Sequence, residues 1–148
     1  MPQSLSRILL HLVFSTKNRT PLINDDLQPR LYAYITAILS NLKCPSLQTG
    51  GAADHVHILC CHSRTVALCD LMEEVKKSTS KWMKNVGVPI FSWQSGYGAF
   101  SIGESQIEKL IRYIQIQKEH HKVVTFQQEY RKFLELYKIE YDEKYVWD

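Results

Sequence analysis

Hydrophobic and polar positions alternate in some segments of the chain and recur every third or fourth residue in others, which separates strands from helices. Residues 8–14 alternate, so Ile8, Leu10, Leu12 and Phe14 are expected on one face of a strand. A helix is predicted to start near Asn24 or Asp25, because apolar side chains then recur at helical spacing: Leu27, Leu31, Tyr34, Ile35, Ile38 and Leu42. Two strands, 47–50 and 55–61, follow.

The second half of the chain continues the alternation between helices and strands. Thr65 is placed to cap a second helix, which Gly87 and Pro89 end, with this buried stripe: Leu68, Leu71, Met72, Val75 and Trp82. Residues 90–94 and 99–102 are predicted as short strands. A third helix is expected from Ser101 or Ser105, on the stripe Ile107, Leu110, Ile111 and Ile114, and a last one over 126–137.

The predicted order is β-α-β-β-α-β-α with one more helix after it. Two crossover helices on one antiparallel sheet are typical of the ferredoxin-like split βαβ sandwich, an α+β fold. A third helix and a tail helix follow at the C-terminal end. No repeat or linker divides the sequence, so we expect one domain over 1–148. Both crossover helices cover one face of the sheet, and the other face is the expected place for chemistry.

Composition narrows the function classes without naming one. The chain has 148 residues, a net charge of +3 and 45% hydrophobic residues, which excludes a disordered or low-complexity protein. The sequence offers no apolar run long enough for a membrane span and no secretory segment, so we expect a cytoplasmic protein with no membrane partner. The four cysteines show no Cys-x-x-Cys spacing and are expected to be buried, reduced thiols.

The segment 55–61 contains the sharpest local signal, a His-x-His pair. On a strand, His55 and His57 point to one face, while Val56, Ile58 and Cys60 point to the other and are expected in the core. The two imidazoles could share a metal ion, and the small residues 50–53 would let a ligand backbone come near. Two histidines at this spacing also occur by chance. A histidine-triad hydrolase is disfavoured because Leu59 stands where its third histidine would be.

A second candidate pattern is Tyr113 and Gln117, four residues apart on one face of the third helix, which His120 and His121 extend. A glutamine oxygen is a suitable third ligand for a two-histidine site that prefers Mg²⁺ or Mn²⁺. A tyrosine with an ordinary pKa near 10 is a weak nucleophile, but a cation on a phosphodiester would help its attack. The alternative is an amphipathic helix with a half-buried tyrosine and a solvated glutamine.

Together these segments resemble the single-tyrosine transposases of the insertion-sequence 200/605 group, which belong to the HUH endonuclease superfamily. The similarity covers nearly the whole chain, and the segments that carry it occur in order: 11–19, 50–59, 76–82, 93–100 and 113–117. One departure is Ile116, where family sequences often have asparagine.

The resemblance implies a transposase that cuts and rejoins single-stranded DNA beside imperfect hairpins. By residue, it implies Tyr113 as the nucleophile, which becomes joined to a 5′ phosphate, and a Mg²⁺ or Mn²⁺ site formed by His55, His57 and Gln117. It also implies a homodimer in which the tyrosine helix can complete the metal site of the other subunit.

DNA contacts are expected from basic side chains, since phosphate binding needs charge rather than sequence. The candidates are Lys77 and Lys81 on the second helix, with Lys17 and Arg19 after the first strand. Trp93 or Tyr97 could stack on unpaired bases. Each of these residues could equally belong to a solvated face or the core. The alternative function is a non-catalytic nucleic-acid-binding module on the same fold, or a domesticated, inactive transposase.

Overall fold

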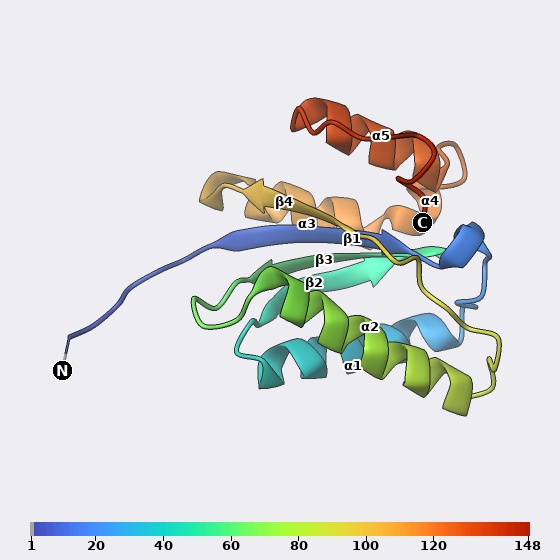
Figure 1. The fold of residues 1–148 in the computed structure, drawn as a ribbon, viewed down its shortest axis with the longest axis horizontal. Helices are drawn as coiled ribbons and strands as arrows, with labels where there is room; N and C mark the ends of the chain where they lie inside the picture. The colour runs from blue at the N-terminus through green and yellow to red at the C-terminus, as the bar shows by residue number, and fades with distance from the viewer. Residues whose placement is uncertain (1) are drawn as a thin grey trace.

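The computed structural model describes residues 2–148, and its centre is a four-stranded antiparallel sheet (Figure 1). The strand order is β2-β3-β1-β4, with these bounds: β1 Leu9–Ser15, β2 Ser46–Gly51, β3 His55–Cys61 and β4 Gly98–Ile102. Each pairing is antiparallel. The order of elements and the strand order confirm the predicted α+β, ferredoxin-like arrangement.

One face of the sheet carries the larger core. Helices α1 (Leu27–Asn41) and α2 (Leu68–Asn85) cover this face, below the sheet in Figure 1. The predicted parity of both central strands is confirmed, because Leu12 and Phe14 of β1 and Val56 and Ile58 of β3 are fully buried here. Asn24, the predicted cap, accepts the N–H of Leu27 with its side-chain oxygen at 2.9 Å.

The opposite face is covered by the C-terminal third of the chain, above the sheet in Figure 1. Helices α3 (Ile107–Gln115), α4 (Gln117–His120) and α5 (Phe126–Leu136) form this layer. Two small apolar clusters hold it: one joins β1 and β3 to α3, and the other joins β1 and β4 to α5. The odd-numbered side chains of β1 and β3 therefore lie between the sheet and this second helical layer.

The small residues before β3 serve the packing of α3. A Cβ on Gly50 would lie 2.7 Å from Cγ2 of Ile114, so this glycine lets α3 approach β2. Part of the space at 50–53 that was predicted for a ligand backbone is thus occupied by α3 of the same chain.

Two local predictions are wrong, and a third holds for one of its two alternatives. The third helix starts at Ile107, near Ser105, which lies in the preceding 3₁₀ turn η2 (Glu104–Gln106); the other alternative, Ser101, lies in β4. Thr65 does not cap α2, because its hydroxyl contacts the Ser63 hydroxyl at 3.0 Å and the helix starts at Leu68.

Residues 90–94 do not form a strand either; only a single bridge pairs Trp93 with Thr16. The backbone carbonyls of the following loop bond to the Lys76 ammonium instead of a neighbouring strand: those of Gln94, Ser95 and Gly96. All four cysteines are free; Cys44 and Cys60 are buried as predicted, but Cys61 is half-buried and Cys69 is exposed. Among residues 2–148 no helix is long and apolar enough to span a bilayer.

Candidate active site

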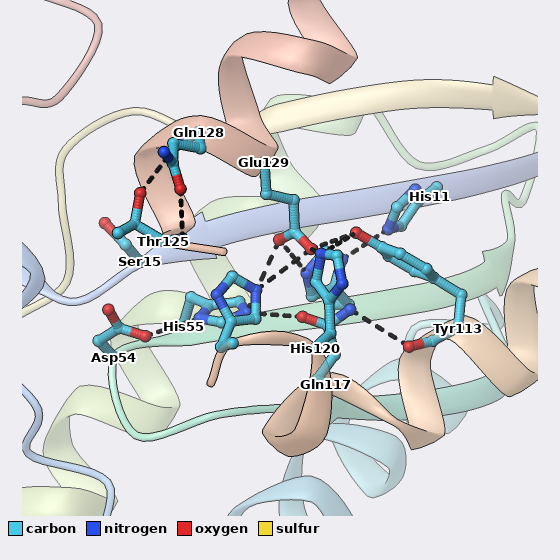
Figure 2. A network of polar contacts seen from close by, with 12 residues as sticks. His11, Ser15, Asp54, His55, Tyr113, Gln117, His120, Thr125, Gln128 and Glu129 are labelled. Atoms are coloured by element: carbon cyan, nitrogen blue, oxygen red, sulfur yellow. Dashed lines mark hydrogen bonds and ion pairs between the residues drawn. The ribbon is translucent and has the colours of Figure 1, made fainter. Parts of the chain in front are cut away.

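The two histidines of β3 lie under the second helical layer and are fully buried. Their ring centroids are 5.1 Å apart, which confirms that they share a face. The Asp54 carboxylate accepts a hydrogen bond from Nδ1 of His55 at 2.7 Å, so Nε2 of that ring is left facing the site. Nδ1 of His57 lies 2.8 Å from Nε2 of His11, a residue of β1 on the same side of the sheet. Nδ1 of each ring is therefore engaged, and Nε2 points to the helical layer: that of His55 to Gln117 of α4 (Figure 2) and that of His57 to Glu129 of α5.

Tyr113 and Gln117 approach the histidines from the helical layer. Oε1 of Gln117 lies 2.9 Å from Nε2 of His55, and the amide nitrogen of Gln117 donates to the Tyr113 carbonyl at 3.2 Å. The helix is interrupted at Ile116, whose ψ of 16° separates α3 from α4. Ile116 itself is exposed. Tyr113 and Gln117 therefore lie on a shared face, as predicted, although the helix is broken between them.

Glu129 of α5 joins these groups, as Figure 2 shows. Its side chain is 3% exposed. Oε1 lies 2.8 Å from Nε2 of His57, while Oε2 accepts a hydrogen bond from the Tyr113 hydroxyl. His120 and His121 each place Nε2 3.2 Å from Oε2. One carboxylate therefore touches the histidine pair on one side and the tyrosine hydroxyl on the other.

The charges of the cluster follow from burial and these contacts. Burial opposes ionisation of Glu129, but His57 and His121 outweigh it and hold the pKa of the carboxyl well below its ordinary value. Burial and the adjacent Glu129 charge raise the pKa of Tyr113 well above its ordinary value. Burial also lowers the pKa of His57 and that of His11. The site thus contains a buried carboxylate, a neutral tyrosine and two imidazoles, those of His57 and His11, that resist protonation.

The donor set fits a divalent cation. Ligand atoms of His55, His57, His121 and Glu129 all lie within 4.8 Å of one another. Nε2 of His121 is buried and has no hydrogen-bond partner among residues 2–148, despite its proximity to Glu129. In the tautomer of His55 that donates Nδ1–H to Asp54, Nε2 and the Gln117 oxygen 2.9 Å away present lone pairs to each other. A cation would satisfy all of these atoms, and imidazole with carboxylate and amide oxygens suits Mg²⁺ or Mn²⁺.

All four residues predicted for the chemistry meet in this cluster: His55, His57, Tyr113 and Gln117. Sequence reasoning missed Glu129 and His11, and it gave His120 and His121 no role. The alternation of β1 placed His11 on the odd-numbered face, which was the available signal for it. Glu129 had none of its own, because the capping box of Thr125 and Gln128 marks only where α5 begins.

The predicted DNA-binding residues lie outside the cluster. Lys77 and Lys81 are exposed on α2, which covers the opposite face of the sheet (Figure 1). Lys17 and Arg19 lie in the 3₁₀ turn η1 (Lys17–Arg19), which follows the strand end at which Ser15 pairs with His55.

The two aromatic candidates differ from each other in exposure. Trp93 is a core residue, and its indole N–H donates to Thr79 at 2.9 Å. It is therefore not available as a stacking surface for bases. Tyr97 is half-buried, with the Lys76 ammonium 5.5 Å from its ring centroid.

Comparison with known proteins agrees with this geometry. Residues 4–117 match the family model described as "Transposase IS200 like". The chain belongs to this transposase family. No curated protein sequence matches it. The matched segment includes the histidine pair, Tyr113 and Gln117, whereas α5 with Glu129 lies beyond it.

Two solved structures share the fold of this IS200-like transposase. A proposed transposase from Deinococcus radiodurans R1 superposes with a TM-score of 0.63 at 17% identity, covering 79% of this chain and 98% of that one. A REP-associated tyrosine transposase bound to a REP hairpin superposes with a TM-score of 0.60 at 16% identity, covering 84% of this chain and 76% of that one.

Proposed function

We propose that this IS200-like transposase cuts and rejoins single-stranded DNA through a covalent 5′-phosphotyrosine at Tyr113. The observation that carries the proposal is the Glu129 carboxylate, which bonds to His57 with one oxygen and to the Tyr113 hydroxyl with the other. A nucleophile and a set of metal ligands thus meet within one buried site of a transposase fold.

The proposed metal ligands are His55, His57 and Gln117, with Glu129 and His121 in reach of the same ion. A bound Mg²⁺ or Mn²⁺ would draw charge from the non-bridging oxygens of the scissile phosphate and stabilise the charge of the transition state. Asp54 and His11 are positioning residues, since each contacts Nδ1 of a ligand histidine and fixes the direction of its Nε2.

Glu129 is also placed to accept the proton that Tyr113 must lose. An ordinary tyrosine is already protonated at neutral pH, and burial and the carboxylate raise the pKa of Tyr113 further. As Tyr113 Oη forms its bond to phosphorus, the bond from phosphorus to the 3′ oxygen of the upstream nucleotide breaks. The phenol proton passes to Glu129 and from there to solvent, and solvent water supplies the proton that the leaving 3′ oxygen takes up. A later 3′ hydroxyl reverses the step without ATP, since the phosphotyrosine conserves the energy of the diester.

Tyr113 reaches the histidines of its own chain, so each chain holds a complete set of the proposed catalytic groups. We propose that the protein works as a homodimer to hold two DNA ends, and that a subunit needs no tyrosine from its partner. Hairpin DNA is the proposed substrate, which agrees with the hairpin bound by the REP-associated tyrosine transposase of the same fold.

The test is incubation of the protein with 5′- or 3′-labelled single-stranded hairpin oligonucleotides from DNA flanking the gene, with Mg²⁺, Mn²⁺ or EDTA. We expect a covalent adduct that carries the DNA 3′ of the cut, only with metal present. Tyr113→Phe should abolish it, and the exposed control Tyr145→Phe should leave it intact. Hairpin binding without any adduct or cleavage would favour the non-catalytic binding module instead.

A further inference from the structure

A cleft opens beside Tyr113, and His11, which contacts His57, also lines it. Its volume is about 390 Å³, within the range of small-ligand sites. Tyr113, His120 and Glu129 of the proposed catalytic site line it, together with Phe133 of α5. The cleft is therefore continuous with the proposed catalytic site but contains none of the groups that would bind the metal except Glu129.

The walls of the cleft are mostly apolar and aromatic. Leu110 of α3 and Phe133 of α5 line it, and Leu136 at its rim is 72% exposed. The Phe133 ring packs on Phe100 and meets the Tyr113 ring edge-on, so its position is fixed from two sides. A flat, fixed aromatic surface next to open space suits stacking of a planar ring.

Two lysines give the cleft a charge that suits DNA. Lys109 of α3 and Lys132 of α5 line it, and both are exposed. Neither forms a salt bridge within residues 2–148: the ion pairs there involve other basic groups. Free ammonium groups around an apolar floor match a nucleotide, which has a planar base and an anionic backbone.

The chemistry of the proposed reaction selects which nucleotide fits. In an in-line displacement, the leaving 3′ oxygen departs opposite the attacking Tyr113 oxygen, so the upstream nucleotide lies away from the tyrosine. The 5′ oxygen of the downstream nucleotide remains to the side of that line. A cleft on the tyrosine's own side is thus reachable by the downstream nucleotide.

We propose that this cleft binds the unpaired base of the nucleotide directly 3′ of the cut, the one that remains attached to Tyr113 through its 5′ phosphate. Phe133 stacks on the base, and Lys109 and Lys132 contact the adjoining phosphates. This inference rests on the proposed function and adds a subsite to it. Cleavage by this transposase would then depend on the presence or identity of that base.

The test uses mononucleotides, so that it does not depend on cleavage. The probe is 2-aminopurine 2′-deoxyriboside 5′-monophosphate, whose fluorescence falls on stacking, titrated with Tyr113→Phe protein in MnCl₂. Deoxyribose 5-phosphate, which lacks the base, should compete about five- to hundredfold more weakly, the range of one stacked base. The 3′-monophosphate isomer should also bind more weakly. Combined Lys109→Gln and Lys132→Gln changes should raise Kd severalfold, and the exposed control Lys84→Gln on α2 should not.

Three results would overturn the subsite: deoxyribose 5-phosphate competing as well as the nucleotide binds, no quenching of the probe, or the same Kd in the Lys109→Gln/Lys132→Gln variant as in the Lys84→Gln control. Each of those results with an intact Tyr113–DNA adduct would leave the proposed function standing. Nucleotide binding as described, without any adduct on hairpin DNA, would overturn the catalytic proposal and retain the cleft as a nucleotide site.

Discussion

Replacing Glu129 with glutamine should weaken metal binding strongly while leaving the fold intact. Glutamine has nearly the same shape and retains an oxygen toward His57, so the change removes mainly one negative charge. That charge lies 2.8 Å from Nε2 of His57 and within 4.8 Å of every other ligand atom of the cluster. Any cation held by His55 and His57 therefore lies next to it.

The expected size follows from these distances. A divalent cation 4.8 Å from a carboxylate gains about 7 kcal/mol at an effective dielectric constant of about 20. Desolvation of both ions offsets most of this gain. If only a fifth remains, about 1.4 kcal/mol, the affinity falls about tenfold. We therefore expect Kd for Mn²⁺ to rise at least about tenfold in Glu129→Gln.

The assay is calorimetric titration of metal-stripped protein with MnCl₂ at pH 7.5, with circular dichroism as the check on folding. The matched control is Glu135→Gln, which removes an exposed carboxylate from the same helix. It should bind Mn²⁺ as the unaltered chain does. An unchanged Kd in Glu129→Gln, or an equal loss in both variants, would refute the placement of Glu129 beside the metal.

Three further predictions concern the subunit, pH and the C-terminal helix. Mixing Tyr113→Phe with His57→Ala protein should restore no DNA cleavage, because each proposed active site needs both residues in one chain; recovered cleavage would show exchange between subunits. In EDTA, urea unfolding should show stability falling from pH 7.5 to 5.5. Burial lowers the pKa of His11 in the folded chain, whereas a histidine of the unfolded chain takes up a proton near pH 6.5. Below that pH the unfolded chain therefore binds one more proton, and the free energy of unfolding falls by up to about 1.4 kcal/mol per pH unit. His11→Asn should flatten that slope, and a flat profile in the unaltered chain would contradict the reasoning. Leu134→Ala, in the buried cluster under α5, should cost about 2–5 kcal/mol in unfolding free energy, against about 0.5 kcal/mol or less for exposed Leu136→Ala; equal costs would mean that α5 is not anchored there.

Alternation was sufficient to predict the central strands and the face of each histidine. Val56, Ile58 and Cys60 all lie in the main core. Because side chains alternate along β3, His55 and His57 must then point to the opposite face of the sheet. The same reasoning fails at residues 90–94, because the Lys76 ammonium binds the carbonyls of the adjoining loop. A contact between residues so far apart in the sequence cannot be predicted from the alternation of hydrophobic and polar positions.

The candidate site was predictable only as far as local motifs reach. His-x-His and Tyr-x-x-x-Gln are short patterns, and only the resemblance to the transposase family indicated that they belong to one site. Glu129 enters through the docking of α5, which depends on apolar contacts of Phe126 and Leu134 with the sheet. The break at Ile116 was equally hidden, since an apolar residue there fits an unbroken helix. Tertiary packing, rather than propensity, brings the carboxylate to the tyrosine.

We propose above all that Tyr113 becomes covalently joined to DNA at a metal-dependent site of its own chain. The most direct measurement is mass spectrometry of proteolytic peptides after incubation with hairpin DNA and Mn²⁺, followed by nuclease trimming. We expect one modified peptide, which contains Tyr113 bearing a 5′-linked nucleotide, and a free 3′ hydroxyl on the released strand. A nucleotide on any other tyrosine, or cleaved DNA without a protein adduct, would contradict this proposal.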